Sequence, residues 1–166
     1  MKKPRKKYRP KGVNLHAITV ATMGVRFLTL ADIEVRVQPV REAVDLIRSG
    51  KASKAHWQAI FDALNMVEQF GQMPGVIEGD LRSWVEAQQT TIVGILDRQK
   101  EGKRALYAAE IDDLMALVEM WESILQNVTH RQYFEAEEAT HKRLAAILRS
   151  GTPGVRLVQV VDMEAA

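Results

Sequence analysis

The amino-acid sequence predicts an all-α fold: an antiparallel bundle of four to five helices with an extended basic N-terminal arm and a short extended C-terminal tail. Apolar residues recur at helical steps of three and four along five segments. Glycines and prolines separate these segments by short turns. A chain of 166 residues is also long enough for one domain with a sizeable core. The predicted divisions are the arm at residues 1–12, the bundle at residues 13–150 and the tail at residues 151–166.

The arm carries most of the charge asymmetry of the chain. Residues 1–12 contain seven Lys or Arg and no acidic residue. The remainder carries −5, and the net charge is therefore only +2. Pro4 and Pro10 prevent a continuous helix and the like charges repel one another, so we expect an extended arm.

Residues 13–25 have no charged side chain and mix apolar with small polar residues. Their periodicity does not decide between a short strand and an extended segment that lies on the body. A basic start followed by an apolar stretch also has the shape of a signal peptide. The polar interruptions and the lack of a small-x-small cleavage site argue against that interpretation. We therefore expect a cytoplasmic protein.

The first helix is predicted over residues 39–48, with Pro39 in the first turn, where its missing N–H costs least. Gly50 ends this helix. The apolar positions that support it also extend upstream: they are Ile33, Val37, Val40, Val44 and Ile47. Residues 33–37 alternate like a strand as well, which leaves their conformation open between helix and strand.

The second helix has Ser53 as its cap and ends at Gly71. A turn at residues 73–75 precedes a third helix, which breaks at residues 101–103. The second helix shows an apolar stripe of Trp57, Ile60, Phe61, Leu64, Val67 and Phe70. The third helix shows Leu81, Val85, Gln88, Ile92 and Ile95 on one face.

The fourth helix has a heptad-like seam, and Thr129 starts a fifth helix over residues 130–149 that Gly151 and Pro153 end. The seam consists of Ile111, Leu114, Val118, Trp121, Leu125 and Val128. From the stripes we predict a core that contains Trp57, Phe61, Leu64, Leu114, Val118, Trp121 and Leu125.

Glu137 is the most informative polar residue of the fifth helix. It falls in the middle of an apolar stripe formed by Tyr133, Phe134, Leu144 and Leu148, with His130 and His141 nearby. Burial of a lone carboxylate is costly, so the first prediction is a structural ion pair with an Arg or His of a neighbouring helix. A partner-binding groove that uses Glu137 and His141 is the first alternative, and acid–base chemistry is the second.

Other polar clusters do not amount to a catalytic or metal motif. Glu138 and His141 have the spacing of a di-iron bundle motif, but the second such pair is missing. Phosphate loops, serine-triad signatures and zinc spacings are missing too. We therefore predict a non-enzymatic protein without metal or cofactor. An acidic surface of Asp112, Asp113, Glu119 and Glu122 is read as a solvated helix face, or as a docking site for the arm.

The composition of the arm favours binding to a polyanion. Tyr8 stands among cations, where a ring can stack on a base while its neighbours bind phosphates. An acidic protein surface and a merely solubilising tail are the alternatives. The predicted nucleic-acid-binding residues are Lys2, Lys3, Arg5, Lys6, Lys7, Tyr8, Arg9 and Lys11.

The sequence RKKYRPKGV at residues 5–13 resembles the opening of a family of short proteins from bacteriophage and prophage genomes. The likeness continues more weakly at residues 50–52, 63–66, 102–104 and 110–119. The family carries no assigned activity. The resemblance implies a phage accessory protein in the bacterial host cytoplasm, which either associates with nucleic acid or inhibits a host defence or regulatory complex. A host protein partner and a homo-oligomer stay open, and no membrane association is expected.

Overall fold

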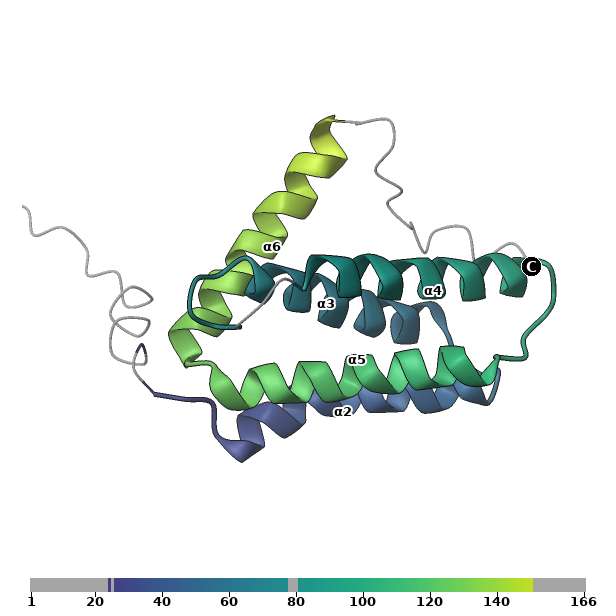
Figure 1. Cartoon of the computed structure of the whole chain (residues 1–166), viewed down its shortest axis with the longest axis horizontal. Coiled ribbons are helices and arrows are strands. Elements are labelled where there is room, and N and C mark those ends of the chain that lie inside the picture. The colour runs from purple at the N-terminus through teal and green to yellow at the C-terminus, as the bar shows by residue number, and fades with distance from the viewer. Residues whose placement is uncertain (1–23, 25, 78–80, 151–166) are drawn as a thin grey trace, which may run out of the picture.

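The computed structural model describes residues 24, 26–77 and 81–150, and it confirms the all-α prediction for them (Figure 1). The predicted arm, nearly all of residues 13–25 and the predicted tail lie outside this part. The helices are α2 (Leu30–Arg48), α3 (Lys54–Gly71), α4 (Arg82–Lys100), α5 (Ala108–Asn127) and α6 (His130–Ser150).

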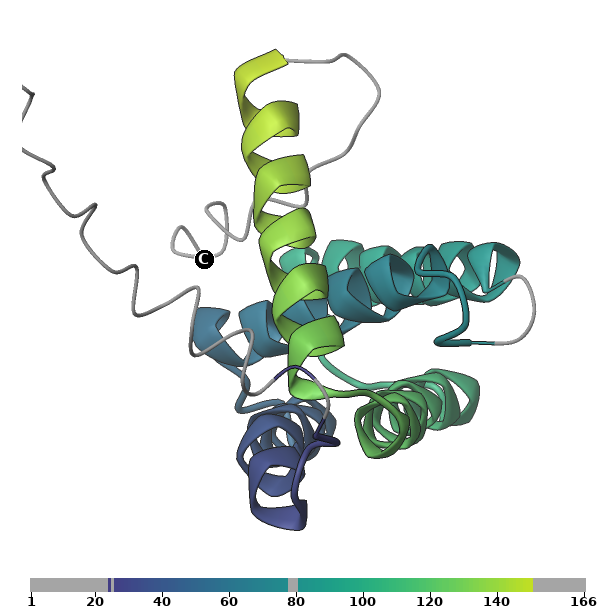
Figure 2. The same cartoon turned by 90° about the vertical axis from the view of Figure 1, so that its left-hand side faces the viewer.

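Four of these helices form a two-layered antiparallel bundle, and the last one leaves it. Figure 1 shows α2 and α5 side by side in one layer and α3 and α4 in the other. Helices α3 and α5 also touch each other across the bundle. Helix α6 starts at one end of the bundle, packs mainly against α3 and then projects beyond the layers (Figure 2). None of the described helices is long and apolar enough to cross a bilayer.

Helix α2 begins at Leu30, so the prediction of a start at Pro39 is wrong, and residues 33–37 are helical. The start is set by a capping box: Asp32 N donates to Thr29 Oγ1 at 3.2 Å, and Thr29 N donates to the Asp32 carboxylate at 3.0 Å. Pro39 instead lies inside the helix, on its exposed side. The carbonyl of Val35, which loses its helical donor to Pro39, belongs to a residue that is 72% exposed, so water can satisfy it.

The start of α2 and the start of α6 are joined by backbone hydrogen bonds. Leu28 N donates to Val128 O at 3.3 Å, and His130 N donates to Arg26 O at 2.9 Å. Phe27 and Thr129 thereby form an antiparallel bridge. Thr129 caps α6 as predicted, since the N–H of Gln132 donates to its hydroxyl at 3.3 Å.

The predicted core is confirmed with one correction. The buried members are Trp57, Leu64, Leu114, Val118, Trp121 and Leu125. Phe61 is only half-buried and packs against the edge of this core. The indole N–H of Trp121 also donates to Arg36 O at 3.2 Å, which ties α5 to α2. The predicted cap Ser53 is confirmed as well, and its backbone N–H donates to His56 Nδ1 at 2.8 Å.

Candidate functional site

Helix α6 buries a different face from the one that its apolar stripe predicts. Its buried residues are Ala136 and Thr140, whereas Phe134 is 36% exposed and Leu148 is 60% exposed. Around the helix, Ala136 and Thr140 lie about 100° and about 60° from Glu137, the centre of the predicted face. The small residues explain this outcome, because they allow α6 to approach α3 closely. Thr140 Oγ1 lies 3.6 Å from Met66 Sδ across this contact.

Because α6 leans outward, an open groove of about 290 Å³ lies between it and helices α2, α3 and α5. We call it the α6 groove. Its floor is apolar and buried, with Val40, Ala63 and Trp121. The full lining consists of Arg36, Pro39, Val40, Ala59, Asp62, Ala63, Met66, Trp121, Tyr133, Glu137, Thr140, His141 and Leu144.

Arg36 and Tyr133 form one end of the α6 groove. The Arg36 guanidinium lies over the Tyr133 ring at 4.4 Å from its centroid, and its Nη1 donates to Asp32 O at 2.7 Å. The Arg36 Nε is buried and has no hydrogen-bond partner among the described residues. Burial raises the pKa of the Tyr133 hydroxyl, and the nearby Glu137 carboxylate raises it further.

Glu137 lines the α6 groove as a half-buried carboxylate. The predicted ion pair to a neighbouring helix is not formed with any residue in the described ranges. His141 lies on the same wall but is exposed, and Glu138 points elsewhere, to Lys142 Nζ at 2.7 Å. The α6 groove therefore combines an apolar floor with a carboxylate that can accept hydrogen bonds or pair with a cation.

The predicted acidic face on α5 is only partly solvated. Glu122 pairs with Arg41 of α2 at 2.6 Å, and Asp113 accepts a hydrogen bond from the Thr91 hydroxyl of α4 at 2.7 Å. Asp112 and Glu119 are exposed. In the part of the chain with described coordinates, no three His, Asp or Glu side chains are grouped so that they could hold a metal ion.

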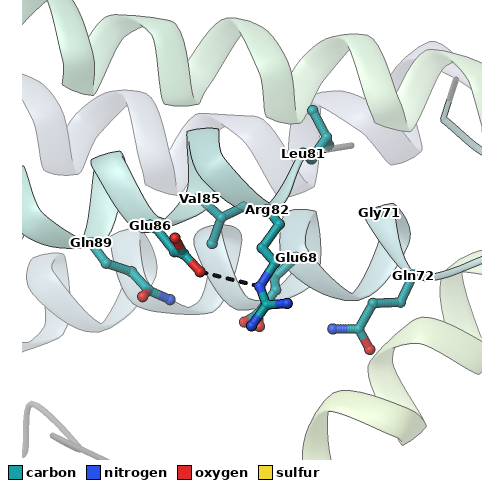
Figure 3. A pocket seen from close by; sticks show the side chains of 8 residues that line it. All are labelled: Glu68, Gly71, Gln72, Leu81, Arg82, Val85, Glu86 and Gln89. Atoms are coloured by element: carbon teal, nitrogen blue, oxygen red, sulfur yellow. Dashed lines mark hydrogen bonds and ion pairs between the residues drawn. The ribbon is translucent and has the colours of Figure 1, made fainter. Parts of the chain in front are cut away.

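A second hollow, of about 480 Å³, lies between the end of α3 and the start of α4 (Figure 3). Leu81 and Val85 line it together with charged and amide side chains, and the charges are already engaged. Arg82 Nε contacts Glu86 Oε1 at 3.2 Å, and Glu68 contacts Arg143 Nη1 at 2.8 Å. This hollow has no comparable apolar floor or unengaged charge, so the α6 groove is the stronger candidate.

No protein-family model, curated protein or solved structure matches this chain. The candidate site therefore depends on the geometry of its own residues.

The sequence predicts Glu137 and His141 as residues of a candidate groove and Tyr133 as part of the apolar stripe, and it misses Arg36 and Asp62. The sequence does contain a signal that residues before Pro39, Arg36 among them, belong to a helix. Thr29 followed three residues later by Asp32 resembles a capping box, and a helix that starts there turns residues 33 and 37 inward. The arm residues predicted to bind nucleic acid lie outside the described ranges.

Proposed function

We propose that this protein is a non-enzymatic phage or prophage accessory protein that binds nucleic acid or a nucleoprotein through its basic arm in the bacterial cytoplasm. The observation that carries the proposal is the separation of charge: seven cations stand in residues 1–12, and the rest of the chain carries −5. A dense cationic segment gains affinity for a polyanion by the release of counterions.

The cations among the described residues support the proposal, because most of them are engaged locally. Ion pairs within 4 Å involve Arg41, Arg48, Arg82, Arg98, Lys100, Lys103, Arg131, Lys142 and Arg143. A phosphate that binds one of these side chains would have to compete with the carboxylate that already pairs with it. The arm has no such internal competitor within its own sequence.

A salt series tests this function. Full-length protein and a variant without residues 1–12 are compared for binding to duplex DNA, single-stranded DNA and RNA. If about four to six phosphates are neutralised, the slope of log K against log salt on duplex is roughly −4 to −5, and the deletion flattens it by that amount. The Tyr8→Ala variant should weaken single-strand binding by roughly 1–3 kcal/mol.

The matched control removes charge from the body. Lys51, Lys54 and Arg104 are exposed cations of the body, and Gly50, the neighbour of Lys51, lies beside Arg104, because a Cβ on Gly50 would come within 3.8 Å of Arg104 Cβ. They form no ion pair with a described side chain. A triple alanine variant of these residues should keep the full salt slope. Equal, weak binding by the full-length and truncated proteins would exclude the nucleic-acid function.

A host-directed factor that inhibits a bacterial defence or regulatory complex is the second candidate function. The exposed side chains of Phe134 and Leu148 on the projecting α6 favour it, since they offer an apolar contact surface. Capture of one host polypeptide by the full-length protein, lost in a Phe134→Ser, Leu148→Ser variant and kept after deletion of the arm, would support this candidate over the first.

A further inference from the structure

We infer that the α6 groove is the docking site for the protein's own residues 13–25, so that the apolar segment before α2 lies between α2, α3 and α6. This inference does not depend on nucleic-acid binding. It follows from where the described chain begins, how long the preceding segment is and what the groove offers chemically.

The chain enters at the base of the α6 groove. Arg26 and Leu28 are hydrogen-bonded to the start of α6, at 2.9 Å to His130 N and 3.3 Å to Val128 O. Beside them, His130 Nε2 lies 3.5 Å from the Asp32 carboxylate of α2. The groove opens about one helical turn further on, with Arg36 over Tyr133. Residues that precede Arg26 are therefore tethered next to the site.

Residues 13–25 are long enough to line the groove. Thirteen residues span up to about 43 Å when extended, as in either conformation that their sequence leaves open. Leu144, the groove residue farthest along α6, lies 14 positions beyond His130, or about 21 Å. The tether also keeps the entropy of loop closure small, because the segment continues directly from the anchored residues.

The chemistry of the segment matches the groove. Residues 13–25 carry no charge, and their apolar side chains can cover the buried floor at Val40 and Ala63. Their hydroxyl and backbone N–H groups can donate to Glu137 without bringing a like charge near it. The C-terminal residues 151–166 fit less well, because Asp162 and Glu164 would approach the carboxylates of Asp62 and Glu137.

Docking would also limit where the basic arm can act. Residues 1–12 continue from the segment, so they would leave the molecule near the groove and the projecting α6. The arm would then sample the space around one end of the bundle.

A photo-crosslinking experiment on the full-length chain tests the inference. The chain contains no cysteine, so one Ala59→Cys substitution on the groove wall can carry a photoactivatable maleimide label. The control is Gln89→Cys, an exposed position in the other hollow. Circular dichroism verifies that both variants fold. We expect the Ala59 label to form a crosslink with residues 13–25 of the same chain, and the control label to form none with them.

Two further variants make the test specific. Deletion of residues 1–12 should keep the crosslink, whereas Leu15→Asp with Ile18→Asp should abolish it, because charged side chains cannot cover an apolar floor. Crosslinks from Ala59 to residues 151–166 or to a second copy of the chain would overturn the inference. The same holds if the folded Ala59 variant yields no crosslink to residues 13–25.

Discussion

Tyr133 and Glu137 line the same side of the α6 groove, one helical turn apart, and the Glu137 carboxylate affects the protonation of the Tyr133 hydroxyl. The pKa of Tyr133 is raised first by burial and then by the Glu137 charge. The folded state therefore favours the protonated phenol, and this contribution to stability is lost as the pH rises above about 10. Glu137→Gln should lower the pKa of Tyr133 without restoring its ordinary value.

An ultraviolet titration of phenolate measures this change, with Tyr133→Phe as the control that separates Tyr133 from Tyr8 and Tyr107. Since Glu137 has no ion pair with a described residue, the Gln variant should also melt at an unchanged or slightly higher temperature. An unaltered Tyr133 titration would show that the carboxylate does not act on the ring.

Thr29 and Asp32 form the second residue-scale prediction. The hydrogen bond from the Thr29 hydroxyl is the largest cause of the lowered pKa of Asp32. The stabilising carboxylate is present above the ordinary pKa of 3.8, and its contribution is lost as the pH falls through the lower folded value. Thr29→Ala should reduce the free energy of unfolding at neutral pH by about 1 kcal/mol.

Chemical denaturation of Thr29→Ala, with Thr90→Ala on an exposed part of α4 as the control, measures that loss. Carbon-detected NMR titration should also show the pKa of Asp32 rising toward its ordinary value in the Thr29 variant. A variant with full stability and an unchanged Asp32 titration would contradict the assignment of the cap.

At the scale of the element, Pro39 inside α2 weakens a helix that the rest of its sequence supports. Pro39→Ala restores the N–H that can donate to Val35 O and removes the clash of the proline ring with that turn. The gain is reduced because alanine gives the unfolded chain more freedom, by about 0.4–1 kcal/mol. We expect a net stabilisation of about 2 kcal/mol.

Urea unfolding measures this gain, and Gln38→Ala at the neighbouring exposed position is the control. A loss of stability in Pro39→Ala would mean that the ring contributes more through its contact in the α6 groove than it costs the helix.

The predicted start of α2 and the predicted buried face of α6 are wrong for different reasons. At α2, the prediction places the start at Pro39, although a capping box lies ten residues earlier, at Thr29, and this local signal sets the observed start. At α6, the pattern supports two faces: the large apolar residues lie on one, and Ala136 with Thr140 lies on the other. The choice is made by how closely α6 can approach α3, which is a tertiary property that periodicity does not contain.

At the scale of the whole molecule, the seam of α5 is the centre of the fold. Val118 is 5% exposed and α5 packs against α2, α3 and α4. Val118→Asp should lower the free energy of unfolding by about 3–5 kcal/mol, because it places an unpaired charge in the core. Glu119→Asp at the adjacent exposed position is the matched control. Thermal melting checks this, and an unchanged melting temperature would place the seam at the surface.

The sequence predicts the helices and most of the core, because helical spacing along α3, α4 and α5 has one apolar face each. The α6 groove is harder to predict. Its residues come from four helices, and it exists only because α6 leaves the bundle at an angle (Figure 2). Glu137 stands out as a carboxylate in an apolar stripe, whereas Arg36 and Asp62 look like ordinary surface charges until the helices are placed.

The bridge between Phe27 and Thr129 has a consequence for protein engineering. It holds the two ends of the four-helix unit side by side, because Leu28 N donates to Val128 O and His130 N donates to Arg26 O. A unit whose ends meet can be spliced into a surface loop of a host protein without forcing that loop apart. Residues 26–130 thus have ends that lie side by side, and this is the geometry that insertion into a loop requires.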